Sequence, residues 1–152
     1  HVVYESTDPC VRSGGCQCIG NGLRAILRTA QRRNVSPSAA IVDSRTLQSS
    51  PESGGRAGYD GAKKRKGSKV HLAVDTLGHL LALHVTPANE GDRAQVQQLA
   101  HSVQEVTGHN VQVATVDAGS PGEADSAAAE GEGVRLTVVK LPNAGGEKRG
   151  VV

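Results

Sequence analysis

Large apolar side chains are scarce in this chain of 152 residues, which contains no Phe, no Trp and no Met. Tyr4 and Tyr59 are its only aromatic residues. A hydrophobic core must therefore be built from Val, Leu, Ile and Ala, without the large area that a buried aromatic ring contributes. The length fits one domain of ordinary size. We expect a marginally stable domain or a fragment of a larger one.

Long apolar runs are also missing. None approaches the roughly 18 residues that a membrane span needs, and no segment has the pattern of a signal peptide. The three cysteines, Cys10, Cys16 and Cys18, are an odd number, which argues against a closed disulfide framework and favours a reducing cytoplasm. A zinc site built on them is the weaker alternative, because the spacing of Cys16 and Cys18 is shorter than usual.

The net charge is only +2, but the positive charges gather in two places. One is a helical face and the other a Lys-rich segment: Arg24, Arg28 and Arg32, then Lys63, Lys64, Arg65, Lys66 and Lys69. The arginine face is typical of a solvated helix surface, and phosphate contact is the alternative. A charge this small does not by itself establish polyanion binding.

The chain divides into four segments. Residues 1–21 have no clean period, and we expect them to be irregular. Residues 22–38 hold a helix, predicted by the spacing of Leu23, Ile26 and Leu27, and a linker that begins near Asn34. Residues 39–141 carry the main pattern of strands and helices, and we expect the tail, residues 142–152, to be irregular.

Within residues 39–141 the periodicity predicts strands at 39–47, 70–75, 80–85, 111–116 and 134–141, and helices at 92–107 and from 120 to 130. Residues 48–68 read as a loop rich in Gly, Ser and Lys. Gly78 lies between two apolar segments that form a predicted hairpin. This order predicts an α/β domain with helices packed on a sheet, and it is also the order of the ribonuclease H-like fold.

Two aspartates follow apolar strands directly: Asp43 after Ala40-Ile41-Val42, and Asp117 after Thr115-Val116. Strand ends are where ligand-binding residues converge in parallel sheets. If the two strands are neighbours, the carboxylates can share a hard cation such as Mg²⁺, which takes oxygen ligands. A turn or cap role is the alternative, and it already accounts for Asp75 and Asp92.

Several motifs occur in order along residues 39–119. They are Ile41-Val42-Asp43-Ser44, Gly58-Tyr59-Asp60, the Lys63–Lys69 segment, Val74-Asp75-Thr76-Leu77-Gly78, Val85-Thr86-Pro87-Ala88-Asn89 and Val116-Asp117-Ala118-Gly119. Together they resemble the DDE transposases of bacterial insertion sequences.

The resemblance implies a ribonuclease H-like mixed sheet with flanking helices, in which Asp43 and Asp117 are the first two acids of a catalytic triad that binds Mg²⁺ or Mn²⁺. It implies DNA as the partner, both transposon ends and target, with the two basic clusters near the DNA backbone. A homo-oligomer is compatible with it, and no membrane or small-molecule substrate is implied.

The chain departs from the family pattern in three places. Residues 1–21 do not match the helical, Trp-bearing region that precedes the core, and Ser120-Pro121 replaces the expected pair after the second acid. The family's third acid lies on a helix beyond the last strand, whereas Glu147 is the only acid in the tail here. We therefore expect a core incomplete at its C-terminus and impaired in cleavage, or alternatively a non-enzymatic DNA-binding remnant.

Overall fold

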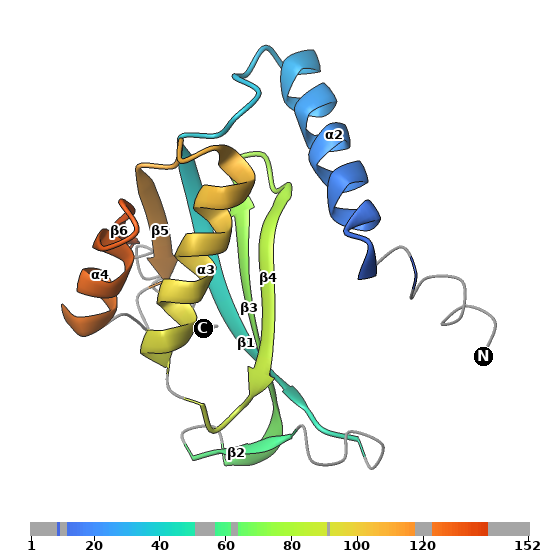
Figure 1. Ribbon diagram of the computed structural model, residues 1–152. Coiled ribbons are helices and arrows are strands. Elements are labelled where there is room, and N and C mark those ends of the chain that lie inside the picture. The colour runs from blue at the N-terminus through green and yellow to red at the C-terminus, as the bar shows by residue number, and fades with distance from the viewer. Residues whose placement is uncertain are drawn as a thin grey trace, which may run out of the picture.

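The computed structural model describes residues 9, 12–50, 57–61, 64–90, 92–117 and 123–139. Among the helices of the described residues, two lie against the sheet and one stands apart from it (Figure 1). The elements, in chain order, are α2 (Gly15–Ala30), β1 (Ala39–Gln48), β2 (Gly58–Asp60), β3 (Arg65–Asp75), β4 (Leu80–Pro87), α3 (Asp92–Thr107), β5 (Val113–Asp117), α4 (Glu123–Glu130) and β6 (Arg135–Val139).

The strands form one six-stranded mixed sheet in the order β2-β3-β1-β5-β6, with β4 paired to β3. β3 is antiparallel to β1, β2 and β4, whereas β5 is parallel to both β1 and β6. Helix α3 leads from β4 to β5, and helix α4 leads from β5 to β6 (Figure 1). This mixed sheet with flanking helices is compatible with the ribonuclease H-like fold, and the sequence predicted it.

The hairpin of β3 and β4 turns at Asp75, as predicted. Its carboxylate oxygen Oδ1 accepts hydrogen bonds from the backbone N–H groups of Leu77 and His79, both at 2.9 Å. Gly78 has a φ of +84°, a left-handed conformation that costs glycine little. The turn therefore combines an aspartate that caps the backbone with a glycine that permits the reversal.

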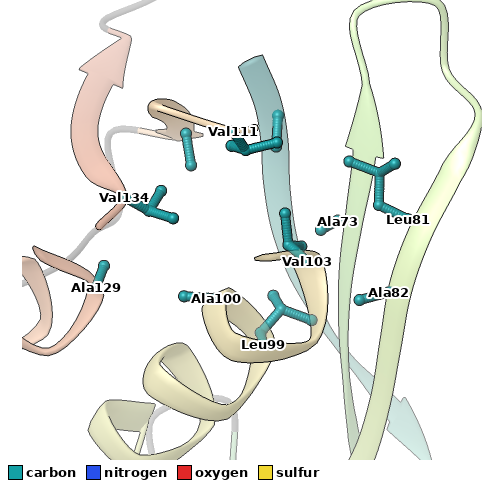
Figure 2. Close-up of a cluster of buried hydrophobic side chains, with 11 residues drawn as sticks. Ala73, Leu81, Ala82, Leu99, Ala100, Val103, Val111, Ala129 and Val134 are labelled. Atoms are coloured by element: carbon teal, nitrogen blue, oxygen red, sulfur yellow. The ribbon is translucent and has the colours of Figure 1, made fainter. Parts of the chain in front are cut away.

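The hydrophobic core lies between the sheet and helix α3. Figure 2 shows Leu99 and Val103 of α3 on the side of strand residues Ala73 and Ala82, and Ala100 on the side of Ala129. On the other side of α3, the cluster continues through Val111, Ala129 and Val134. Fully burying a Val or Leu side chain contributes about 1.5–3 kcal/mol, and an Ala contributes less. A core so rich in alanine agrees with the modest core expected from the composition.

The opposite face of the sheet, which we call the open face, carries Ile41, Asp43, Arg45 and Leu47 of β1. Strand side chains alternate, so these residues point away from Ala40, which is buried in the core. Ile41 is 43% exposed and Leu47 is 51% exposed. The described helices therefore leave this face of the sheet accessible.

Helix α2 begins earlier than predicted, at Gly15, so the expectation that all of residues 1–21 is irregular is wrong for 15–21. Gly14 precedes it in a left-handed conformation with φ +71°. The apolar spacing of Leu23 and Ile26 extends back to Ile19, and the glycines between them obscure that continuity. In Figure 1 the helix stands apart from the sheet, beside the turn of the β3–β4 hairpin.

The expected loop at residues 48–68 is also partly wrong, because it contains β2 and the first residues of β3. Backbone pairing overrides the weak local propensity: Gln48 pairs with Gly67, and Tyr59 pairs with Lys66. Residues 51–56, 62–63, 118–122 and 140–152 lie outside the described residues, and with them the predicted tail at 142–152.

Candidate metal and DNA site

The register of two parallel strands brings Asp43 and Asp117 to the same level of the sheet. Val42 pairs with Val116, and the two aspartates are the next residue on each strand. Neighbouring strands lie about 4.8 Å apart, so the two backbone positions are close. The condition on which the metal hypothesis depended, that these strands be neighbours, is met.

Asp43 is exposed and lies on the open face, opposite Leu72 of β3. An exposed carboxylate keeps its oxygens accessible to a cation. For Asp117 only the backbone is described. Among the residues whose side chains the structure describes, no three His, Cys, Asp or Glu side chains gather as a metal site. Cys16 and Cys18, named in the zinc alternative, are exposed on α2, and Cys10 lies outside the described residues.

The Lys-rich cluster forms the exposed end of the β2–β3 hairpin. Lys64, Arg65 and Lys66 are exposed, and Lys69 is half-buried within β3. Lys63 lies outside the described residues. Three adjacent exposed cations form a local positive surface, which attracts phosphate without reading the base sequence.

Polar contacts and close backbone packing fix this hairpin on the end of β1. The hydroxyl of Thr46 donates a hydrogen bond to Asp60 Oδ2 at 2.8 Å, and both side chains are buried. The backbone N–H of Ser49 donates to the carbonyl of Lys66 at 2.9 Å. A Cβ on Gly67 would lie 2.0 Å from the carbonyl oxygen of Leu47, so only glycine allows this approach.

The arginine face of α2 is not solvated, and that expectation is wrong for two of its three residues. Arg24 is 7% exposed and Arg28 is 5% exposed. Arg24 donates to the carbonyl oxygens of Leu80 and Val106, at 3.0 and 3.5 Å. Arg32 is exposed, just beyond the helix, with a φ of +56°.

Arg28 joins α2 to the core through Asp75. Its Nη1 lies 2.6 Å from Asp75 Oδ2, and its Nε donates to the carbonyl of Asn34 at 2.7 Å. The buried carboxylate of Asp75 at the hairpin turn requires a cation nearby, and Arg28 of α2 supplies it. Helical spacing showed which arginines share a face, but it did not show that this face points inward.

Opposing effects act on the Asp75 carboxyl. Burial by itself would raise its pKa. The backbone N–H of His79, the guanidinium of Arg28, the N–H of Leu77 and the ring of His79 favour the ionised form. Together they hold the pKa of Asp75 below its usual value. Asp75 therefore stabilises the hairpin turn as an ionised carboxylate, and this agrees with the turn role that the sequence predicted for it.

Two exposed residues, Arg45 and Tyr59, are not among the site residues predicted from the sequence. Arg45 lies two residues beyond Asp43, on the same face of β1. Tyr59 is 60% exposed in the centre of β2. In a strand, Tyr59 and Asp60 must point to opposite faces. The sequence could have predicted that Tyr59 is exposed only if residues 58–60 had first been predicted to form a strand.

A groove of about 560 Å³ separates α2 from β4. Leu23, Leu27 and Leu83 contribute to its walls, together with His84, whose Nε2 lies 3.1 Å from Ser102 Oγ. Asp43 does not line it. The groove is therefore separate from Asp43.

No helix in the described part of the chain is long and apolar enough to cross a membrane.

The strand order and the level aspartates define a ribonuclease H-like α/β domain that carries acidic residues on adjacent strands. A family model described as a transposase DDE domain matches residues 35–138, more than half of the chain. The chain belongs to this transposase family, whose substrate is DNA and which generally uses divalent metal ions. No match is found among curated proteins.

Proposed function

We propose that Asp43 and Asp117 are the metal-binding carboxylates of a DDE transposase that cleaves and joins phosphodiester bonds during movement of an insertion sequence. The observation that carries the proposal is the register of β1 and β5, which brings both residues level on adjacent parallel strands. The family match covers both residues. The protein would act in the bacterial cytoplasm, as a homo-oligomer, on transposon ends and target DNA.

The residues present fit a hard cation. Mg²⁺ takes oxygen ligands and often uses only one or two protein carboxylates, leaving coordination sites for phosphate. A divalent ion held there, Mg²⁺ or Mn²⁺, would activate the attacking oxygen and stabilise the leaving oxygen of the phosphodiester. Asp43, exposed on the open face, would hold its carboxylate towards the DNA.

The DNA backbone is proposed to lie along the exposed cations Lys64, Arg65 and Lys66, with Arg45 between them and Asp43. Lys63, Lys69 and Arg32 remain candidates for further contacts. Arg24 and Arg28 are assigned instead to holding α2, because their guanidinium groups are buried and bonded to protein acceptors.

The chain on its own is proposed to cleave DNA weakly. Among the residues whose side chains are described, no third acidic side chain joins the aspartate pair. Two carboxylates bind one cation, but they give less support to the paired ions that clamp both oxygens of an in-line displacement. Robust cleavage by the unmodified chain, matching a complete DDE enzyme, would contradict this part of the proposal.

The central test compares Asp43→Asn with Glu130→Gln, an exposed acid on α4. Two measurements are made on each protein: Mn²⁺ binding, followed by broadening of the amide NMR signals of Val42 and Val116, and Mg²⁺-dependent nicking of supercoiled DNA. Asp43→Asn should lose the broadening and the nicking, while Glu130→Gln keeps both. Equal Mn²⁺ binding by Asp43→Asn and the unmodified chain would exclude the proposed site.

A non-enzymatic DNA-binding remnant is the second candidate, favoured by a basic hairpin that does not include the aspartates. In that case DNA binding persists in chelator and in Asp43→Asn, and no nicking occurs under any metal condition. Lys66→Gln should reduce the slope of log affinity against log salt by about 0.9 on duplex DNA. Absence of salt-dependent binding would rule out both candidates.

A further inference from the structure

Tyr59 holds an unusual position for a chain so poor in aromatic residues. It is one of only two aromatic side chains in 152 residues. It is 60% exposed and lies outside the core cluster. A large ring exposed to solvent on a short strand contributes little to folding. Packing in the hydrophobic core therefore does not account for the presence of a tyrosine at position 59.

Strand alternation shows which way Tyr59 points. Its neighbour Asp60 is buried and accepts a hydrogen bond from Thr46, which is four residues along β1 from Val42 on the core-facing side. Successive side chains of a strand point to opposite faces. Tyr59 therefore lies on the open face, the face that carries Asp43.

The register of the neighbouring strands leads to the same result. Leu47, on the open face, pairs with Ser68, and Lys66 lies two residues before Ser68 on β3. Lys66 in turn pairs with Tyr59. Residues directly opposite on antiparallel strands project from one face, so the ring and the ammonium group are neighbours on the surface.

The backbone beneath Tyr59 is held firmly. A Cβ on Gly58 would lie 2.7 Å from the backbone nitrogen of Asn89 and closer still to its side chain. The Thr46–Asp60 hydrogen bond fixes the other side of the tyrosine. A ring on a rigid strand loses little conformational freedom when it binds, which favours a stacking role.

An exposed aromatic ring beside a row of cations matches one kind of partner. Proteins that hold single-stranded nucleic acid combine basic side chains along the backbone with aromatic rings on which bases stack. Lys66, beside the ring on the open face, and Lys64 at the turn provide the cations here, and Tyr59 provides the ring. Arg65 pairs with Asp60 and projects from the other face. No comparably exposed aromatic ring occurs elsewhere in the part of the chain that the structure describes.

We propose that Tyr59 stacks on an unpaired base of the DNA strand whose phosphates lie along Lys64 and Lys66. This rests on the proposed function. Lys66 is level with Ser49, the residue after β1 and six residues beyond Asp43, which is roughly 20 Å at the rise of a strand. The stacked base would then lie about that far from the phosphodiester bond held at Asp43.

The absence of tryptophan gives a direct spectroscopic test. In a Tyr4→Phe chain, Tyr59 is the only aromatic side chain with phenol emission. Titration with a short oligothymidylate should quench that emission to saturation as the ring stacks. Unchanged emission at saturating oligonucleotide would overturn the inference.

Two variants of Tyr59 distinguish the contribution of base stacking to binding from the contributions of apolar contact and of charge. Tyr59→Phe keeps the ring and should bind oligothymidylate within about twofold of the unmodified chain, whereas Tyr59→Leu should bind roughly 10-fold more weakly. The salt slope should not change in Tyr59→Leu, but it should fall by about 0.7 in Lys66→Gln. Because Tyr59 is exposed, circular dichroism should show both tyrosine variants folded as the unmodified chain.

The outcomes distinguish failure of this inference from failure of the proposed function. If the unmodified chain binds DNA in a salt-dependent way and Tyr59→Leu binds equally well, the stacking role alone is excluded. If the unmodified chain binds no DNA, the proposed function fails and the stacking role fails with it. Equal weakening in Tyr59→Phe and Tyr59→Leu would point to the phenol hydroxyl and would also exclude stacking.

Discussion

Arg28 and Asp75 form a buried ion pair, with Arg28 Nη1 2.6 Å from Asp75 Oδ2 and side chains only 6% and 0% exposed. The pair joins residues 47 positions apart, linking helix α2 to the turn between β3 and β4. The apolar side chains of α2 do not make this attachment, since Ile19 and Ile26 are 61% and 66% exposed. Polar contacts therefore hold this helix in place.

Removing Arg28 should strongly destabilise the protein. Arg28→Met leaves the Asp75 carboxylate buried without its cation, and breaking a buried pair in this way costs about 3–5 kcal/mol. Urea unfolding followed by circular dichroism gives the free energy of unfolding. Arg32→Met, at an exposed position, is the matched control and should change it by less than about 0.5 kcal/mol. Similar values for the two variants would contradict the anchoring role.

Acid should remove the contribution of Asp75. Its pKa is lowered in the folded protein from an ordinary value of 3.8. A depressed pKa stabilises the fold above the unfolded value, and this stability is lost as pH falls through the folded value. The difference in unfolding free energy between the unmodified chain and Asp75→Asn should therefore be constant from pH 7 to about 5 and shrink below about pH 4. A difference that does not depend on pH would show that another group carries the effect.

Gly67 should not tolerate a side chain. A Cβ there would lie 2.0 Å from the carbonyl oxygen of Leu47, which is backbone and cannot rotate away. Gly67→Ala should lower the free energy of unfolding by about 1–3 kcal/mol, as overpacking does. Gly61→Ala, where nothing lies within 4 Å, is the control and should be nearly neutral. Equal stability of the two variants would mean that β1 and β3 are less closely apposed.

His101 on α3 should titrate above its ordinary pKa of 6.5. A hydrogen bond to Glu132 at 3.0 Å is the main cause, and the charges of Glu105 and Glu132 add to it. A raised pKa stabilises the fold below about pH 6.5, and this contribution is lost as pH rises through the folded value. NMR titration of the imidazole gives the value directly. Glu132→Gln should move it back towards 6.5, and Glu105→Gln should have the smaller effect.

Periodicity in the sequence predicted most of the sheet. The spans of β1, β4 and α3 follow the apolar pattern closely, because each buries one face against the others. Residues 58–60 and 65–68 escaped prediction since they carry few apolar side chains and form strands through backbone pairing with β1 and each other. The amino-acid pattern of a short segment does not predict which distant segment it pairs with.

The aspartates were predicted from their place after apolar strands, but the level register of β1 and β5 could be seen only in the fold. The direction of the α2 arginines was missed for a related reason. A helical face of arginines is normally exposed, and what reverses it here is Asp75, more than forty residues away. The spacing of residues within the helix does not predict an ion pair with a residue so far away in the sequence.

The proposed metal site depends on the alignment of β1 and β5, in which Val42 pairs with Val116. A slip of β5 by a single residue would bring Val116, and not Asp117, level with Asp43, although every acidic residue would still be present. Substitutions at Ala114, which is buried in the core cluster on β5, should therefore weaken the proposed metal binding without touching either acid. The proposed metal site therefore depends on the packing of β5 against the core as well as on the two acids.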